Sequence, residues 1–370
     1  MINVKFLDKY IDGYSKVFPF SGVLRVTERD KIIYERNVGY ADYVEKVPFD
    51  KNSMFTYYSI SKPFCVLGLM KLCDKGLVDI DNHPSVYLPE MSGFDCNLTL
   101  RHLLHHTSGL PDFEQTPLYK EKYYDDELPI RKELLRLKEI TKGIAPGKEF
   151  KYQNINFICA ALIIENVSGI EYSEYMRKEI FDPLEMKTAI VDKVGFEIPN
   201  RVHEYEYEYD GKNFYPVEKS TRWMFGAGDI VGTADNLYKL NIAIKNRLIL
   251  KESTWDTVLS PFGVSGAFGM GCMVFDWHDK KRIQHNGGHS GFRTLHVQLA
   301  EDDFDIILLS NYGGGNARED FSEAIYAARY GLPKEIAEFH KMDSGYIGET
   351  KDEKAISNEI LLRNYNKYNR

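Results

Sequence analysis

The sequence predicts an α+β protein, because β-rich and helical patterns fall into separate blocks of the 370 residues. Two β-rich runs, residues 20–27 and 32–40, are followed by a mostly helical block from residue 64 to about residue 181. Strand-like patterns return from about residue 204 and continue to residue 310. Segregation of this kind is typical of an antiparallel sheet with helices packed against it.

The N-terminal block is expected to be a helix followed by a hairpin. Residues 3–16 place large apolar side chains at helical spacing. The polar residues 28–31 separate the two β-rich runs, which is a hairpin signal. A loop then leads to Ser59.

The middle block is expected to contain several helices. The helix after Ser59 should end near Gly76, and Ser168-Gly169 is a typical helix C-cap. A turn over residues 145–150 should lead into Tyr152. The further helical segments are expected at residues 101–106, 128–140, 155–167 and 171–180.

The last block returns to strands. Glu and Tyr alternate over residues 204–209, and the following Asp210-Gly211 predicts a hairpin turn. Residues 227–246 should form a glycine-rich loop and a helix, and residues 321–330 a closing helix. Strands are expected at residues 270–277, 282–285, 294–299 and 305–310. The charged, Asn-rich tail, residues 333–370, should be helix plus disorder.

Composition excludes some classes of function. The formal net charge of -8 argues against nucleic-acid binding. The five cysteines contain no C-x-x-C pair, so we expect free thiols in a reducing compartment. The N-terminus lacks the apolar core of a signal peptide, and no stretch is long enough to span a membrane. These features together predict a cytoplasmic protein.

Ser59 and Lys62 form an S-x-x-K motif at the expected start of a helix. Residues three apart lie on one helix face, so the two side chains should project together. A helix N-terminus also directs free N–H groups and a positive dipole end toward the serine. A nucleophile needs these two features, a nearby base and donors for developing negative charge. The motif is common by chance, so its meaning depends on the rest of the chain.

His102, His105 and His106 are close in sequence but lack the spacing of a metal site. No metal and no other cofactor are therefore expected.

The chain resembles the serine β-lactamase and penicillin-binding-protein superfamily, on its class C-like branch of esterases, D-peptidases and carboxypeptidases. The resemblance covers roughly residues 15–330 and rests on six motifs in order, which is far more specific than S-x-x-K alone. They lie at residues 55–62, 103–110, 146–154, 181–186, 226–235 and 285–292.

This resemblance implies a β-lactamase/DD-peptidase-like fold, with an antiparallel sheet flanked by helices and an inserted, mainly helical domain. The sheet domain would be discontinuous, residues 1–62 and 221–332. Residues 63–220 would form the inserted domain, and residues 333–370 the tail. Ser59 would lie at the junction of the two domains.

The resemblance also implies roles for the site residues. Ser59 would be the nucleophile, and Lys62 and Tyr152 would shuttle its proton; which of the two is the base stays open. Asn154 would bind Lys62 and the substrate amide. The backbone N–H groups of Ser59 and Gly288 would form the oxyanion hole. His106 would be structural.

The strand at His285-Asn286-Gly287 departs from the K-T-G of many relatives. Gly287 would let a substrate backbone approach closely. A neutral imidazole gives less attraction for a substrate carboxylate than lysine does. Arg293 could supply that charge or could be an exposed strand residue.

The sequence therefore predicts a serine hydrolase that cleaves an ester or amide of a small molecule or short peptide. D-peptidase, penicillin-binding or β-lactamase activity is one alternative, and a catalytically silent protein that binds peptides or cell-wall fragments is another. The sequence predicts no oligomeric state.

Overall fold

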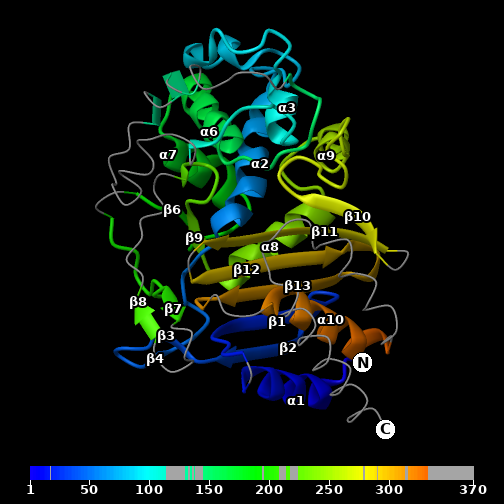
Figure 1. Ribbon diagram of the computed structural model, residues 1–370. Coiled ribbons are helices and arrows are strands. Elements are labelled where there is room, and N and C mark those ends of the chain that lie inside the picture. Colours follow the sequence, from blue (N-terminus) through cyan, green and yellow to red (C-terminus); the bar gives the residue numbers. More distant parts are fainter. Residues whose placement is uncertain are drawn as a thin grey trace.

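A six-stranded antiparallel sheet forms the base of the molecule in the computed structural model (Figure 1). The structure describes residues 1–16, 18–113, 130–131, 134–135, 137, 145–193, 196–207, 214–216, 224–277, 280–289, 291–312 and 316–331. The strand order is β10-β11-β12-β13-β1-β2. The bounds are β1 Gly22–Glu28, β2 Lys31–Val38, β10 Met273–Trp277, β11 Lys280–His289, β12 Phe292–Leu299 and β13 Phe304–Ser310. The predicted α+β fold is confirmed.

The N-terminal hairpin and the C-terminal strands share this sheet through β13. All of β13 is buried, as its apolar sequence predicts, and it pairs with β12 on one side and with β1 on the other. Gly22 pairs with Ser310, so two segments that are 288 positions apart in the sequence lie side by side here.

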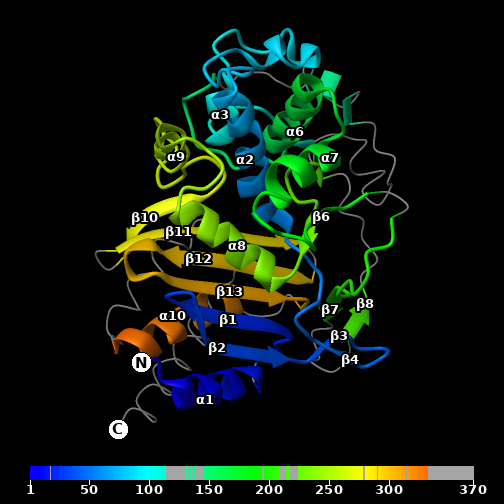
Figure 2. The same ribbon diagram turned by 180° about the vertical axis from the view of Figure 1, so that it is seen from behind.

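Helices cover both faces of the sheet. The helices α1 (Val4–Ser15) and α10 (Ala317–Tyr330) pack on one face (Figure 1). There the rings of Tyr10 and Tyr14 meet Phe321 edge to face. The helix α8 (Ala234–Lys245) lies on the opposite face, as the view from behind shows (Figure 2). Five apolar side chains of α1 are buried, which accounts for the helical spacing seen in the sequence.

A helical layer stands beside the end of the sheet where β11 and β10 lie (Figure 1). Its central helices α2 (Ser61–Asp74) and α6 (Ile155–Ser168) bury most of their residues against each other and their neighbours. Gly169 ends α6 in the left-handed conformation at φ 71°, as expected of its cap. The other helices are α3 (Leu100–Leu104), α7 (Tyr172–Met176), a π-helical turn Arg177–Phe181 and α9 (Glu252–Val258).

Several details differ from the expectations. The α-helix that was expected to begin at about Ser59 begins at Ser61, because residues Tyr58–Ile60 form a 3₁₀ turn. Neither α9 nor the strand β9 (Ile230–Gly232) was expected. Most of the helix expected at residues 128–140, the turn at Asp210-Gly211 and the tail after residue 332 lie outside the described residues.

The remaining described strands are short and form three small sheets. The strand β9 pairs with β5 (Phe55–Thr56) and β6 (Ile190–Val191). The remaining short strands are β3 (Tyr40–Asp42) with β4 (Val47–Pro48), and β7 (Tyr205–Tyr207) with β8 (Phe214–Pro216). The last pair agrees with the hairpin expected near residue 204. Further 3₁₀ turns lie at Pro84–Val86, Pro89–Met91 and Ala300–Asp302.

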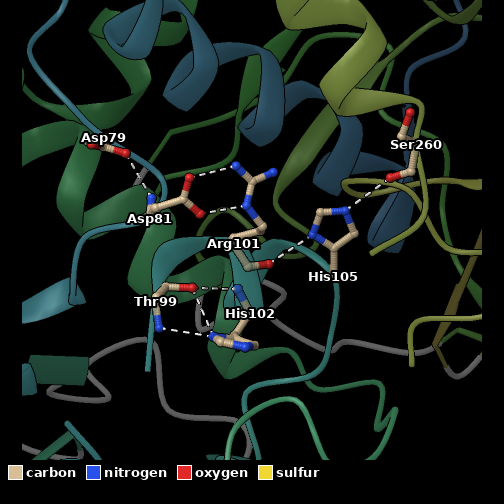
Figure 3. Close-up of polar contacts among 7 residues, drawn as sticks. All are labelled: Asp79, Asp81, Thr99, Arg101, His102, His105 and Ser260. Atoms are coloured by element: carbon tan, nitrogen blue, oxygen red, sulfur yellow. Dashed lines mark hydrogen bonds and ion pairs between the residues drawn. The ribbon is translucent and has the colours of Figure 1, made fainter. Parts of the chain in front are cut away.

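His102 and His105 hold the backbone around α3 in place (Figure 3). His102 closes a capping box with Thr99 at the start of α3. His105 bridges the carbonyl oxygens of Arg101 and Ser260, at 2.9 and 3.2 Å, and so ties α3 to the segment after α9. Within the described ranges, no group of three or more His, Cys, Asp or Glu side chains could hold a metal ion.

All five cysteines are free thiols, and Cys65, Cys159 and Cys272 are buried. Among the described helices, none alone is long and apolar enough to cross a membrane. Only α6 together with Tyr172–Phe181, which are bent by 82° against each other, reaches the required length and composition.

Candidate active site

Ser59 lies in the 3₁₀ turn that links β5 to α2, at the junction of the sheet and the helical layer. The turn is held from behind, because Tyr57 N donates to Ile230 O at 2.9 Å. Tyr58 has φ 51°, in the left-handed region that non-glycine residues rarely adopt. Strain of this kind costs about 1–3 kcal/mol and persists only where surrounding contacts hold it.

Lys62 is fully buried beside Ser59. Its Nζ lies 3.0 Å from Ser59 Oγ, 2.9 Å from Asn154 Oδ1 and 2.9 Å from Ala227 O. Three acceptors match the three N–H groups of an ammonium. A neutral amine could keep the two bonds to Asn154 and Ala227 and turn its lone pair toward the Ser59 hydroxyl. The arrangement thus suits both protonation states.

The loop that supplies Ala227 O is held by a buried carboxyl group. Asp229 accepts a bond from Gly226 N at 2.9 Å, and Ile230 N donates to Ser61 Oγ at 2.9 Å. Burial raises the pKa of Asp229 to about 7. A Cβ at Gly226 would come within 2.5 Å of the Ala161 Cβ, so only glycine lets the loop pass this close to α6.

Tyr152 and Asn154 approach Lys62 from the segment before α6. The Tyr152 ring centroid is 4.8 Å from Lys62 Nζ, and the ring stacks on His106 with centroids 4.2 Å apart. Gln153 N donates to His106 Nδ1 at 3.1 Å, so His106 holds the Tyr152–Asn154 segment. The buried Asp112 accepts from Asn154 N at 2.6 Å, which fixes the backbone of that residue.

The strand β11 passes directly against the Ser59 turn. A Cβ on Gly287 would lie 2.1 Å from Tyr57 O and 3.1 Å from Ser59 N. Thr294, which pairs with Gly287 across the sheet, donates its hydroxyl to Tyr57 O at 2.9 Å. The close approach at Gly287 is therefore to the protein's own backbone. It brings Gly288 next to Ser59, where the resemblance expects the second oxyanion donor.

The two histidines near Lys62 are neutral. Burial and the positive charge of Lys62 lower the pKa of His285 to about 3, and the same two causes hold the pKa of His106 well below its usual value. His285 therefore brings no full positive charge to the site at neutral pH.

A cavity of about 730 Å³ opens over Ser59. Ser59, Tyr152, Arg293 and residues 285–288 line this cavity. Lys62 is not in the lining, but it is bonded to Ser59 and to Asn154. Every predicted site residue thus belongs to one constellation. The full lining comprises Ser59, Phe150, Lys151, Tyr152, Phe268, Met273, His285, Asn286, Gly287, Gly288, His289, Arg293 and Arg318.

The charged side chains that line this cavity are basic, and one of them, Arg318, has its Nε 3.8 Å from Glu319 Oε1. Lys151, Arg293 and Arg318 line it, and none of its described lining residues is Asp or Glu. Arg318, in the first turn of α10, is buried and points its Nη1 toward Gly287 O at 3.4 Å. Sequence reasoning missed Arg318 because nothing in the helix pattern distinguishes it. It also missed Asp112, whose place after Gly-Leu-Pro gave no sign of a bond to Asn154.

Comparisons with known proteins agree with this architecture. A family model described as Beta-lactamase matches residues 8–329. Penicillin-binding protein 4* of Bacillus subtilis (strain 168) is 25% identical over 364 residues, which cover 90% of this chain and 78% of that protein.

Solved structures show the same fold. A penicillin-binding protein from Bacillus halodurans superposes with a TM-score of 0.75 at 22% identity, covering 87% of this chain and 98% of that one. A D-amino acid amidase from Ochrobactrum anthropi SV3, complexed with D-phenylalanine, gives 0.74 at 22% identity, covering 88% and 98%.

Gly287→Ala should abolish turnover, because the added methyl group would collide with Tyr57 O and push β11 away from Ser59. Overpacking of this kind typically costs about 1–3 kcal/mol of stability. Gly76→Ala is the control. It has nothing within 4 Å and carries a similar cost, about 1–2 kcal/mol, from its left-handed φ of 72°. Thermal unfolding of both variants measures the loss of stability, and esterase assays measure whether turnover is lost only in Gly287→Ala. Full activity in Gly287→Ala would show that the strand can retreat without consequence.

Proposed function

This chain belongs to the beta-lactamase family, and on that premise we propose that it cleaves an ester or amide through an acyl-enzyme formed on Ser59. A D-aminopeptidase of Gluconobacter oxydans (strain 621H) is among the proteins to which the chain is similar, at 23% identity over 324 residues. The family accommodates several substrates, so the proposal depends on the site itself.

One observation carries the proposal. A fully buried lysine lies 3.0 Å from the hydroxyl of Ser59 and is held from two other elements by Asn154 and Ala227. Burying an amine is costly unless its polar atoms are bonded. An amine placed this way, under a cavity and against a partly exposed hydroxyl, is suited to accept that hydroxyl's proton.

In the proposed reaction, Ser59 Oγ attacks the substrate carbonyl carbon and its proton passes to the Lys62–Tyr152 pair. The carbonyl electrons move to an oxyanion that the N–H groups of Ser59 and Gly288 stabilise. The oxyanion collapses, the carbon–oxygen or carbon–nitrogen bond breaks, and the leaving group takes the proton from Tyr152. Water then adds to the acyl-enzyme by the same steps and releases the acid.

Ser59→Ala should lower turnover by at least about a thousandfold while the protein stays folded. A fluorophosphonate followed by mass spectrometry should label the wild type at Ser59 and leave the variant unlabelled. Peptide mapping of the labelled wild type should place the adduct on Ser59 and not on Ser61. A wild type that forms no adduct with fluorophosphonate or penicillin would favour the silent, peptide-binding alternative.

Lys62 and Tyr152 should act as one unit, since the lysine lies against the tyrosine ring. Lys62→Ala combined with Tyr152→Phe should therefore lose little more kcat than the worse single variant. Steady-state kinetics of the two single variants and the double variant measure this. Losses that simply multiply would mean that the two residues act independently.

A second candidate function is hydrolysis of substrates that carry a carboxylate, such as C-terminal D-amino-acid peptides or β-lactams. The positive lining of the cavity favours it, because Arg293 and Arg318 could bind a carboxylate while the neutral His285 could not. A neutral ester makes no such demand.

Arg293→Ala should change the activity on these two classes of substrate to different extents. If the guanidinium binds a carboxylate, activity on carboxylate-bearing substrates should fall by about tenfold to a hundredfold, the usual effect of losing a charge-assisted bond. Activity on short-chain p-nitrophenyl esters should stay within about twofold. His285→Lys should change the ratio in the opposite direction. Arg36→Ala, on β2 and paired with Asp8 and Asp12, is the control for loss of an arginine. An equal fall on both classes would remove the case for a carboxylate site.

A further inference from the structure

We infer that Glu204 is a positioning residue for the oxyanion hole, because its carboxylate joins the turn between β11 and β12 to the residue before Ser59. The inference rests on the proposed function and deepens it. It concerns the distance between two backbone N–H groups, those of Ser59 and Gly288. It does not concern the identity of the substrate or the path of the proton.

Glu204 is buried, with 7% of its surface exposed, and both of its oxygens are engaged. Its Oε2 accepts a bond from the Tyr58 hydroxyl at 2.8 Å. Its Oε1 accepts from Gly291 N at 2.6 Å and from Phe292 N at 3.4 Å. One carboxylate therefore holds two segments that are far apart in the sequence.

The backbone on either side of Glu204 is itself anchored to the sheet layer. Tyr205 N donates to Asn311 O at 3.0 Å, and the Asn311 amide donates to His203 O at 2.9 Å. A Cβ on Gly291 would lie 2.2 Å from Tyr205 O, so the turn and this segment are in direct contact. Glu204 is a fixed point to which the turn and Tyr58 are attached.

Each attachment lies next to one oxyanion donor. The Ser59 N–H belongs to the planar peptide unit that Tyr58 begins, so a fixed Tyr58 fixes the direction of that N–H. Gly288 is followed by His289, which pairs with Phe292 at the end of the hairpin. Tyr58 also stacks on His289, with ring centroids 5.7 Å apart and planes at 22°.

The Tyr58 contacts also explain its unusual backbone. Its φ of 51° is strained, and the bond to Glu204 together with full burial keeps the side chain in one position. Burial, and next the Glu204 charge, hold the pKa of Tyr58 well above its usual value, so its hydroxyl stays a donor. Thr294 and Gly287 hold β12 and β11 against Tyr57, and Glu204 adds the bonds that fix Tyr58 and the end of the hairpin relative to each other.

The test compares Glu204→Ala, Glu204→Gln and Tyr58→Phe with the wild type on one ester and on its thionoester. Sulfur is a weak hydrogen-bond acceptor, so the ratio of ester to thionoester turnover reports on the alignment of the oxyanion donors. Tyr34→Phe is the matched control. Tyr34 is also buried and donates to a carboxylate, Asp8 Oδ1 at 2.9 Å, but it lies on β2 away from the cavity.

Glu204→Ala should lower kcat by about tenfold to a hundredfold with little change in KM, since the donors act mainly in the transition state. Its ester-to-thionoester ratio should fall as well. Glu204→Gln keeps an acceptor oxygen for the turn and should retain most of the activity. Tyr58→Phe should lose about three- to tenfold in kcat, and Tyr34→Phe nothing. Combining Tyr58→Phe with Glu204→Ala should add no further loss.

Several outcomes would overturn the inference. They are an unchanged kcat in Glu204→Ala, a loss confined to KM, an unchanged ester-to-thionoester ratio, or a loss as large in Tyr34→Phe as in Tyr58→Phe. If Glu204→Ala does not fold, Tyr58→Phe alone decides by the same criteria. Fluorophosphonate labelling of the wild type separates the two proposals. No Ser59 adduct would overturn the proposed function and this inference with it, whereas an adduct with full turnover in Glu204→Ala would overturn the inference alone.

Discussion

The structure of the site depends on one buried amine and its three acceptors. Lys62 is carried by α2, while its partners come from the start of α6, the loop before β9 and the Ser59 turn. A buried cation or amine with an unpaired N–H would be strongly destabilising, so these segments cannot move apart independently. The same contacts that make the lysine tolerable inside the protein place it against the Ser59 hydroxyl. The contacts that stabilise the junction of the two layers are therefore the same contacts that set the position of Lys62 relative to Ser59.

The sheet contributes the opposing wall. Gly287 and Thr294 bring β11 and β12 against the carbonyl of Tyr57, and Glu204 fastens their turn to Tyr58. Only a residue without a side chain fits where the strand crosses the turn. The cavity then has one wall from the helical layer, which carries Tyr152, and one from the strand edge, which carries Gly288.

The fold and the central residues could be predicted because their signals are local. The apolar run of β13, the cap at Gly169 and the spacing of Ser59 and Lys62 are each visible within a few neighbouring residues. Tyr152 and Gly288 were found through ordered motifs, since no spacing rule joins residues so far apart. Asp112, Glu204 and Arg318 were missed because their partners lie far away in sequence, at Asn154, Gly291 and Gly287. A carboxylate or arginine gives no sign of such a partner until the chain has folded.

The meeting of β1 with β13 has a consequence for how the chain is made. Ser310 Oγ donates to Ser21 O, two residues 289 positions apart, and the strand between β1 and β12 is supplied only by β13. A ribosome adding about 5–20 residues per second needs roughly 15–60 s to synthesise that interval. During this time the hairpin β1–β2 has an open edge that its own neighbours cannot cover, and such edges attract other chains. The nascent protein therefore spends most of its synthesis without its central strand, and the cavity over Ser59, which residues of β11 and β12 line, is assembled only after most of the described chain has been made.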